Sequence, residues 1–208
     1  MHSHATDKRI QIDTDKAELT ALLQWASNDN ARTIHHPAIN CAAEIAATDG
    51  HTAIVVGREH RPSANDWRVI PRGLLETAIK AQPAKGSIEI ASRVGSDDFT
   101  ITVRDKQKLE VITLHGHYQP GWPPLANVWP SRPSAPNRAA LNPEYLARFA
   151  KVCKAIGMRP EITIVPASGR DPWHITAVPR DGSRIWSAIV MPIDRCDCPV
   201  PGPVDGGQ

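Results

Sequence analysis

One arrangement of segments recurs three times in this 208-residue chain and limits the folds that it can adopt. Each time, a short extended segment precedes an amphipathic helix, and β-rich sequence follows the helix. The expected helices lie near Asp15 to Ser27, near Arg72 to Gln82, and from Pro143 to Ile156. The extended segments before them are Lys8 to Ile12, Trp67 to Ile70 and Arg138 to Leu141. A β-α-β-β-β unit used repeatedly predicts an α+β fold whose helices share one face of the sheets.

The third helix has the clearest local signals. Leu146, Phe149 and Cys153 follow the three- and four-residue spacing that gathers apolar side chains on one helical stripe. Asn142 can cap the first turn, and Gly157 favours the end of the helix. These signals predict both boundaries of the helix.

Three strand candidates follow the second helix, and three more follow the third. They are Ser87 to Ala91, Phe99 to Val103, Leu109 to Leu114, Glu161 to Val165, Trp173 to Val178 and Arg184 to Met191. After the first helix, two apolar runs meet at Asp49-Gly50, a dipeptide that accepts the positive backbone angles of a tight turn. We therefore expect a β-hairpin centred on these two residues.

A proline-rich segment from Tyr118 to Pro133 separates the second unit from the third. Because proline interrupts helices and central strands, we expect an extended connector without a regular helix. We place the main boundary there, with a complete domain over residues 1–133 and a half-domain over residues 134–195. Residues 196–208 are rich in proline and glycine, which predicts a disordered tail.

Composition narrows the functional classes. The formal net charge is only +2, so any contact with nucleic acid must come from local clusters of cations. No apolar run approaches the roughly 20 residues that span a bilayer, and the N-terminus lacks a signal peptide's apolar core, so we expect a cytoplasmic protein. Cys41, Cys153, Cys196 and Cys198 show no Cys-x-x-Cys spacing, and we expect reduced thiols.

Four motifs occur in a fixed order along the chain: Thr48 to His51 in the hairpin, Trp67 to Leu74 before the second helix, Trp122 to Pro130 in the connector, and Val190 to Ile193. Together they resemble the bacterial DNA polymerase III beta subunit, the sliding clamp. The resemblance implies that residues 8 to about 130 correspond to the central clamp domain and residues 138–195 to half of the last domain. It also implies a DNA sliding-clamp-like accessory protein that tethers replication or repair partners to duplex DNA, as a processivity factor does.

By this resemblance, a pocket between the central and last domains would capture clamp-binding peptides of polymerase or repair proteins. Its lining would be Thr48, Gly50, His51, Pro123, Val128, Val190, Met191, Pro192 and Ile193. Arginines that the family has around this pocket are replaced by Thr52, Ala126, Asn127 and Asp194. Either the partner preference has changed, or these apolar residues are only packed core.

The resemblance also implies a sequence-independent contact between the helices and duplex DNA. The candidate phosphate-binding residues are Arg32, Arg72, Lys80, Lys85, Arg148, Lys151 and Lys154. The first helix sets Lys16 against Asp15 and Glu18, and we expect no basic face there. Family clamps are closed rings with twelve helices around the DNA, so three helices per chain would require a homo-tetramer. A clamp-derived peptide-binding module that does not encircle DNA fits the sequence equally well.

A metal-dependent hydrolase is a further alternative. His35-His36 and His115-Gly116-His117 could supply metal ligands, with Glu44 or Asp49 as a carboxylate partner. The sequence contains no second compact ligand cluster, no glycine-rich phosphate loop and no nucleophile elbow. We therefore expect no enzymatic activity, no cofactor and no metal.

Overall fold

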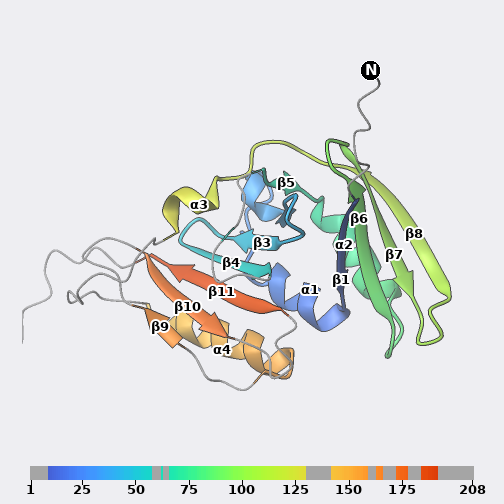
Figure 1. Cartoon of the computed structure of the whole chain (residues 1–208). Helices are drawn as coiled ribbons and strands as arrows, with labels where there is room; N and C mark the ends of the chain where they lie inside the picture. Colours follow the sequence, from blue (N-terminus) through green and yellow to red (C-terminus); the bar gives the residue numbers. More distant parts are fainter. Residues whose placement is uncertain are drawn as a thin grey trace, which may run out of the picture.

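The computed structural model describes residues 9–57, 62, 66–129, 142–158, 163–165, 172–177 and 184–191. These residues form two antiparallel sheets with helices packed between and against them (Figure 1). The expected α+β fold of repeated units is confirmed, and every strand neighbour in both sheets runs antiparallel. No helix in the described part of the chain is long and apolar enough to cross a membrane.

The first sheet has four strands in the order β1-β6-β7-β8. Their bounds are Arg9–Thr14 for β1, Ser87–Arg93 for β6, Asp98–Arg104 for β7 and Glu110–His117 for β8. In β1, buried Ile10 and Ile12 alternate with exposed residues, as expected for a strand with one face against the core.

The second sheet has seven strands in the order β5-β2-β3-β4-β11-β10-β9. Their bounds are Arg68–Val69 for β5, Ala38–Ile39 for β2, Ile45–Thr48 for β3, Thr52–Gly57 for β4, Ile185–Val190 for β11, Trp173–Ala177 for β10 and Thr163–Val165 for β9. β11 pairs with β4 from Ile185 opposite Gly57 to Val190 opposite Thr52. The third unit is therefore joined to the first by a continuous sheet.

The first two units exchange their opening strands. β1, which begins the first unit, pairs with β6 of the second, whereas β5, which begins the second unit, pairs with β2 of the first. Neither of these two sheets is complete without a strand from the other unit, so the two units fold together. The boundary expected near residue 133 lies outside the described residues, as do residues 138–141 and the tail from residue 196.

The three helices begin near the predicted positions, and two of them also end there. α1 spans Lys16–Leu23, α2 spans Arg72–Ala81 and α4 spans Pro143–Ala155, and a short 3-10 turn covers Thr33–His35. Asp15 caps α1 by accepting a hydrogen bond from the Glu18 amide at 2.9 Å, and Asn142 caps α4 through the Glu144 amide at 2.9 Å. Gly157 follows α4 with φ at +73°, the left-handed conformation that ends many helices.

The seven-stranded sheet is covered on both faces. The large core on one face includes Leu22 of α1 and Phe149 of α4. In this core α1 lies between α4 and α2, and α2 packs against β7 and β8 of the four-stranded sheet (Figure 1). A smaller cluster on the other face joins connector residues to alternate residues of the strands: Ala38, Ala46, Ala53, Val55, Trp67, Val69, Trp122, Leu125, Trp129 and Ile189. Burial from both sides explains the continuous apolar runs of β3 and β4.

Two local predictions were wrong. The connector contains a one-turn helix, α3, over Leu125–Val128, because these residues lie between Pro124 and Pro130 and carry no proline of their own. This turn lies on the face opposite the other helices, so the shared helix face holds for α1, α2 and α4 only. α1 ends at Leu23 rather than Ser27, since the Ser27 amide instead donates to the carbonyls of Thr48 and Ile34.

Candidate functional site

The β3–β4 hairpin is fixed by hydrogen bonds within its turn. Asp49 Oδ1 accepts from the His51 amide at 2.9 Å and the Thr52 amide at 2.8 Å, while Thr48 Oγ1 donates to the Thr52 carbonyl at 2.6 Å. Gly50 has φ at +93°, which a side chain would strain. The predicted hairpin is confirmed, and its bonding holds His51 exposed at the tip.

The end of β11 lies directly beside this hairpin. The Met191 amide donates to the His51 carbonyl at 3.0 Å, one step beyond the pairing of Val190 with Thr52. Val190 is fully buried, whereas Met191 is 38% exposed. The structure therefore brings together the predicted residues of the hairpin and of β11, while Pro192 and Ile193 lie outside the described residues.

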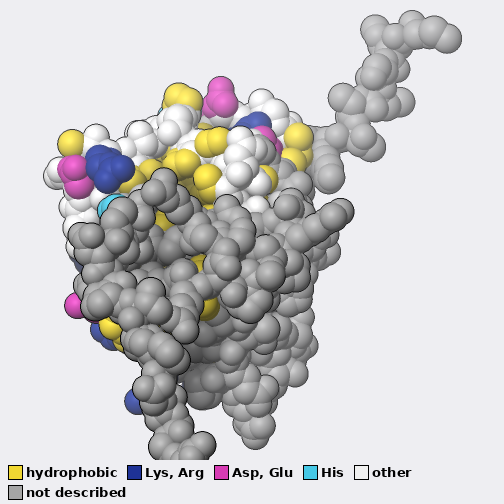
Figure 2. All heavy atoms as spheres, turned by 90° about the vertical axis from the view of Figure 1, so that its left-hand side faces the viewer, with side chains coloured by type: hydrophobic (Ala, Val, Ile, Leu, Met, Phe, Trp, Pro, Cys, Tyr) yellow, Lys and Arg dark blue, Asp and Glu magenta, His cyan; other side chains and the backbone are white. Residues whose placement is uncertain are grey.

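The connector reaches the same end of the molecule. Trp122 Nε1 donates to the His36 carbonyl at 3.0 Å, and Trp122, Leu125 and Trp129 pack in one cluster with Ile189 of β11. In Figure 1, α3 lies above the β3–β4 hairpin and the tip of β11. Figure 2 shows hydrophobic side chains gathered on this end of the molecule.

We call the exposed residues at this end the hairpin surface, defined as Gly50, His51, Val128 and Met191. Val128 is 47% exposed, Pro123 is half-buried, and Thr48 and Val190 are buried. Arg32 also lies here, because a Cβ built on Gly50 would be 3.3 Å from Arg32 Nη2. The structure thus places Arg32 beside the hairpin rather than among the cations of the helices.

Arg148 of α4 joins the third unit to this hairpin. Its Nη1 donates to Asp49 Oδ2 at 2.8 Å, and its guanidinium lies 5.7 Å from the Trp25 ring centroid and 5.6 Å from that of Tyr145. Burial opposes ionisation of Asp49, but the bond from Arg148 and those from His51 and Thr52 hold the pKa of this carboxyl below its usual range. Sequence reasoning assigned Arg148 to DNA contact and missed this pairing, since no spacing links the two residues.

A second ion pair lies near the other end of the β4–β11 junction. Arg184, just before β11, places Nη1 2.8 Å from Glu18 Oε1 and donates to the Asp13 carbonyl at 3.1 Å. Burial raises the pKa of Glu18, although the Arg184 charge and a hydrogen bond from Thr14 oppose this rise. Because Glu18 turns inward, α1 presents a less acidic surface than its sequence predicts.

The remaining predicted cations differ in their surroundings. Arg72 is half-buried and bonds Glu76 of its own helix, with Nε 2.8 Å from Oε1. Lys80 on α2, Lys151 and Lys154 on α4, and Lys85 after α2 are exposed. Lys151 and Lys154 are three residues apart and share one face of α4. The helices therefore present lysines to solvent, while Arg72 and Arg148 make ion pairs within the chain.

Three of the four histidines suggested as metal ligands make polar contacts in the fold, and one of these is His117, whose Nδ1 lies 2.5 Å from Asp98 Oδ1. His36 Nδ1 accepts from the Arg72 amide at 3.1 Å, and His35 Nδ1 lies 2.8 Å from the Ser27 carbonyl. Burial, followed by the charges of His35 and Arg72, lowers the pKa of His36. Among the residues that the structure describes, no three His, Cys, Asp or Glu side chains cluster as metal ligands would.

Comparison with known proteins gives structural but not sequence matches. No protein-family model and no curated protein sequence matches this chain. The DNA polymerase III beta subunit from Borrelia burgdorferi superposes with a TM-score of 0.58 at 9% identity, over 93% of this chain and 66% of that one. The sliding clamp from Bartonella birtlesii gives 0.55 at 12% identity over 94% and 68%, and the H. pylori beta clamp gives 0.54 at 9% identity over 94% and 69%.

The chain thus spans about two thirds of the length of these proteins. At such low identity the likeness concerns the backbone, and it agrees with the clamp-like arrangement of units described above. This chain has the fold of the bacterial sliding clamps.

Proposed function

We propose that this protein is a non-catalytic, clamp-like accessory protein that captures a short peptide of a replication or repair partner on the hairpin surface. The observation that carries the proposal is the hydrogen bond between the Met191 amide and the His51 carbonyl. It joins two segments far apart in the sequence at one exposed, partly apolar surface, and α3 of the connector lies above it in Figure 1. Adjacent apolar and polar groups on a rigid support are typical of peptide-binding surfaces.

The chemistry of the hairpin surface indicates what a partner peptide would need. Val128 and Met191 offer apolar contacts, and the flexible Met191 thioether can adapt to side chains of different shape. His51 and Arg32 add polar groups at the edge of this apolar area. We infer that the partner supplies at least one large apolar side chain together with an acceptor group or an acidic group.

One of the four positions where the family has an arginine, Thr52, has a structural explanation for the replacement. Thr52 is buried, and its Oγ1 donates to Asp49 Oδ1 at 3.0 Å, so this side chain supports the turn instead of facing a ligand. An arginine at this position would have to leave the turn or displace it. The absence of an arginine at Thr52 supports a partner preference different from that of clamps that have an arginine at this position.

The binding test is a titration of the full chain into a fluorescent peptide that carries the clamp-binding segment of a bacterial DNA polymerase. Met191→Glu should weaken binding roughly thirtyfold and shift the anisotropy rise to higher protein concentration, because a carboxylate would enter the apolar contact. Val94→Glu is the matched control, since Val94 is 46% exposed in the β6–β7 turn, away from the hairpin surface. Equal binding by both variants would reject the hairpin surface as the peptide site.

We further propose that the exposed lysines of α2 and α4 approach the phosphates of duplex DNA. α1, α2 and α4 pack into one common core with α1 between the other two, and Lys80, Lys151 and Lys154 are exposed residues of α2 and α4. Exposed cations on a helical layer suit sequence-independent attraction to phosphates. A ring of four such chains would carry the twelve helices of a closed clamp.

A peptide-binding module that does not encircle DNA is the second candidate. It is favoured by one observation: two of the predicted DNA-binding cations, Arg72 and Arg148, are paired with Glu76 and Asp49. Retention on DNA circles separates the two candidates. An encircling ring should remain on a closed circle and leave when the circle is cut, whereas a surface contact should ignore the cut and weaken with salt.

A further inference from the structure

The outward face of the four-stranded sheet contains a cavity of about 820 Å³. Side chains alternate between the two faces of a strand, and Ile90 of β6 and Ile101 of β7 belong to the core. Their neighbours Ala91 and Thr100, which line the cavity, therefore point away from the core. α2 packs against β7 and β8 from the core side, so the cavity and this helix lie on opposite faces of the sheet.

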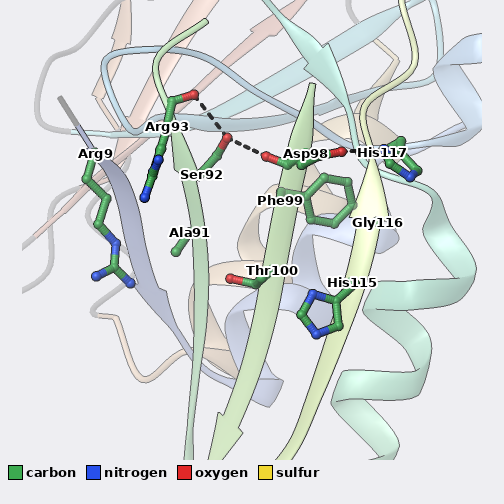
Figure 3. A pocket seen from close by; sticks show the side chains of 10 residues that line it. All are labelled: Arg9, Ala91, Ser92, Arg93, Asp98, Phe99, Thr100, His115, Gly116 and His117. Atoms are coloured by element: carbon green, nitrogen blue, oxygen red, sulfur yellow. Dashed lines mark hydrogen bonds and ion pairs between the residues drawn. The ribbon is translucent and has the colours of Figure 1, made fainter. Parts of the chain in front are cut away.

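The cavity has a low floor between taller walls. Strand pairing sets Ala91 of β6, Thr100 of β7 and His115 of β8 in one row across the sheet. The two small side chains form the floor, His115 borders it on one side, and Arg9 and Arg93 border it on the other (Figure 3). The volume lies within the range of about 300–1,000 Å³ that is typical of small-molecule sites.

Two arginines lie directly opposite each other on one side of this cavity. Arg9 of β1 pairs with Arg93 of β6, so both side chains leave the same face of the sheet. Like charges that oppose each other across two strands destabilise a sheet. Glu89 accepts from Arg9 at 3.0 Å and from Arg104 at 3.2 Å, so one carboxylate serves two arginines. An anion held between Arg9 and Arg93 would reduce their mutual repulsion.

The carboxylate in the cavity lining is engaged by a histidine. Asp98 Oδ1 lies 2.5 Å from His117 Nδ1, and Figure 3 shows this contact directed towards β8. The negative charge of Asp98 is therefore held at the β8 side of the cavity, across the sheet from Arg9 of β1. The β1 side of the cavity is left more positive than the β8 side.

We propose that this cavity binds a small phosphate monoester, with its phosphoryl group between Arg9 and Arg93. Planar guanidinium groups match the oxygens of a phosphate and form charge-assisted hydrogen bonds with them. The organic group of the ligand would lie over Ala91 and Thr100, where the Thr100 hydroxyl and the His115 ring can bond to it. The cavity is much larger than a phosphate ion, which favours a ligand with such an organic group. The site is independent of the proposed function, since it requires neither a peptide nor DNA.

Isothermal titration calorimetry of the full chain tests the site with AMP, adenosine and inorganic phosphate as probes. AMP should bind saturably and more tightly than inorganic phosphate, and adenosine should give no measurable heat of binding. Arg93→Gln should raise the Kd for AMP about tenfold, because it removes charge-assisted bonds to the phosphoryl group. Arg104→Gln is the matched control: Arg104 bonds the same Glu89 but does not line the cavity, so its loss should leave the Kd unchanged.

A second variant tests the organic part of the ligand. His115→Ala should weaken AMP binding and leave the binding of inorganic phosphate unchanged, a difference that a general loss of structure would not give. The proposal would be overturned by the absence of saturable AMP binding, or by equal losses of affinity in Arg93→Gln and Arg104→Gln. Equal affinities for AMP and inorganic phosphate would assign the site to the free ion instead. Displacement of AMP by a short DNA duplex would also contradict it, whereas the peptide titration and the DNA circles test the clamp function separately.

Discussion

Replacing Arg148 with methionine should loosen the third unit from the β3–β4 hairpin while leaving α4 folded. The change removes the 2.8 Å bond to Asp49 and the contact with the Trp25 ring. A charge-assisted bond contributes about 1.5–3 kcal/mol, and the lower part of that range applies because the Arg148 side chain is 32% exposed and that of Asp49 is 17% exposed. The ring contact adds about 0.5 kcal/mol, so we expect a loss of about 2 kcal/mol for Arg148→Met.

A double-mutant cycle with Asp49→Asn isolates the pair. Asparagine keeps an oxygen for the turn but presents an amide to Arg148, so the single change should cost about 1.5 kcal/mol. Urea unfolding of the wild type, both single variants and the double variant should give a coupling of about 1 kcal/mol or more. A coupling below about 0.5 kcal/mol would refute the role assigned to this pair, because exposed pairs often contribute no more than that.

The same pair predicts a pH dependence with a definite sign. Because the folded protein holds the pKa of Asp49 below 3.8, the ionised carboxyl stabilises the fold above that pH. This stabilisation should be lost as the pH falls below 3.8, towards the depressed folded value. Arg148→Met should therefore show a weaker acid-side loss of stability than the wild type in urea melts between neutral and acid pH.

Three further changes test the remaining sites. Met191→Glu should weaken peptide binding roughly thirtyfold, equivalent to about 2 kcal/mol, yet change the unfolding free energy by no more than about 0.5 kcal/mol; global unfolding would show that Met191 is packed core. Changing both Lys151 and Lys154 to glutamine should lower the salt dependence of DNA binding by about two in the log–log slope, and an unchanged slope would remove α4 from the DNA surface. Gly116→Ala should lower the free energy of unfolding by about 1–3 kcal/mol, because its Cβ would be 2.7 Å from a Leu74 methyl and closer still to Phe99. Gly73→Ala is the control, since its Cβ would meet nothing within 4 Å, and it should not destabilise the protein in parallel urea melts.

Local features of the fold were predictable because their causes lie within a few residues. The Asn142 cap, the Gly157 terminator and the Asp49-Gly50 turn each depend on side-chain chemistry next to the backbone that they shape. The one-turn helix α3 escaped prediction because the prolines around it dominated the pattern, although proline before a first turn is compatible with a helix.

Long-range features could not be read from spacing. The exchange of β1 and β5 between the first two units, and the pairing of β11 with β4, depend on which strand edges meet in the folded chain. For the candidate site, the sequence identified the segments that converge, but not the burial of Val190 or the attachment of Arg148 to Asp49. Glu18 shows the same limit, since its inward turn depends on Arg184, which lies beyond the third helix.

The junction of β4 with β11 has a consequence for synthesis of the chain. The paired residues lie roughly 130 positions apart in the sequence, so β4 leaves the ribosome long before its neighbour. During that interval the apolar strand Thr52–Gly57 presents an unpaired edge, and pairings of such high contact order form slowly. Release of the nascent chain before β11 has been made would leave this edge open to other nascent chains, so a fragment that ends within the connector should aggregate unless a chaperone binds it.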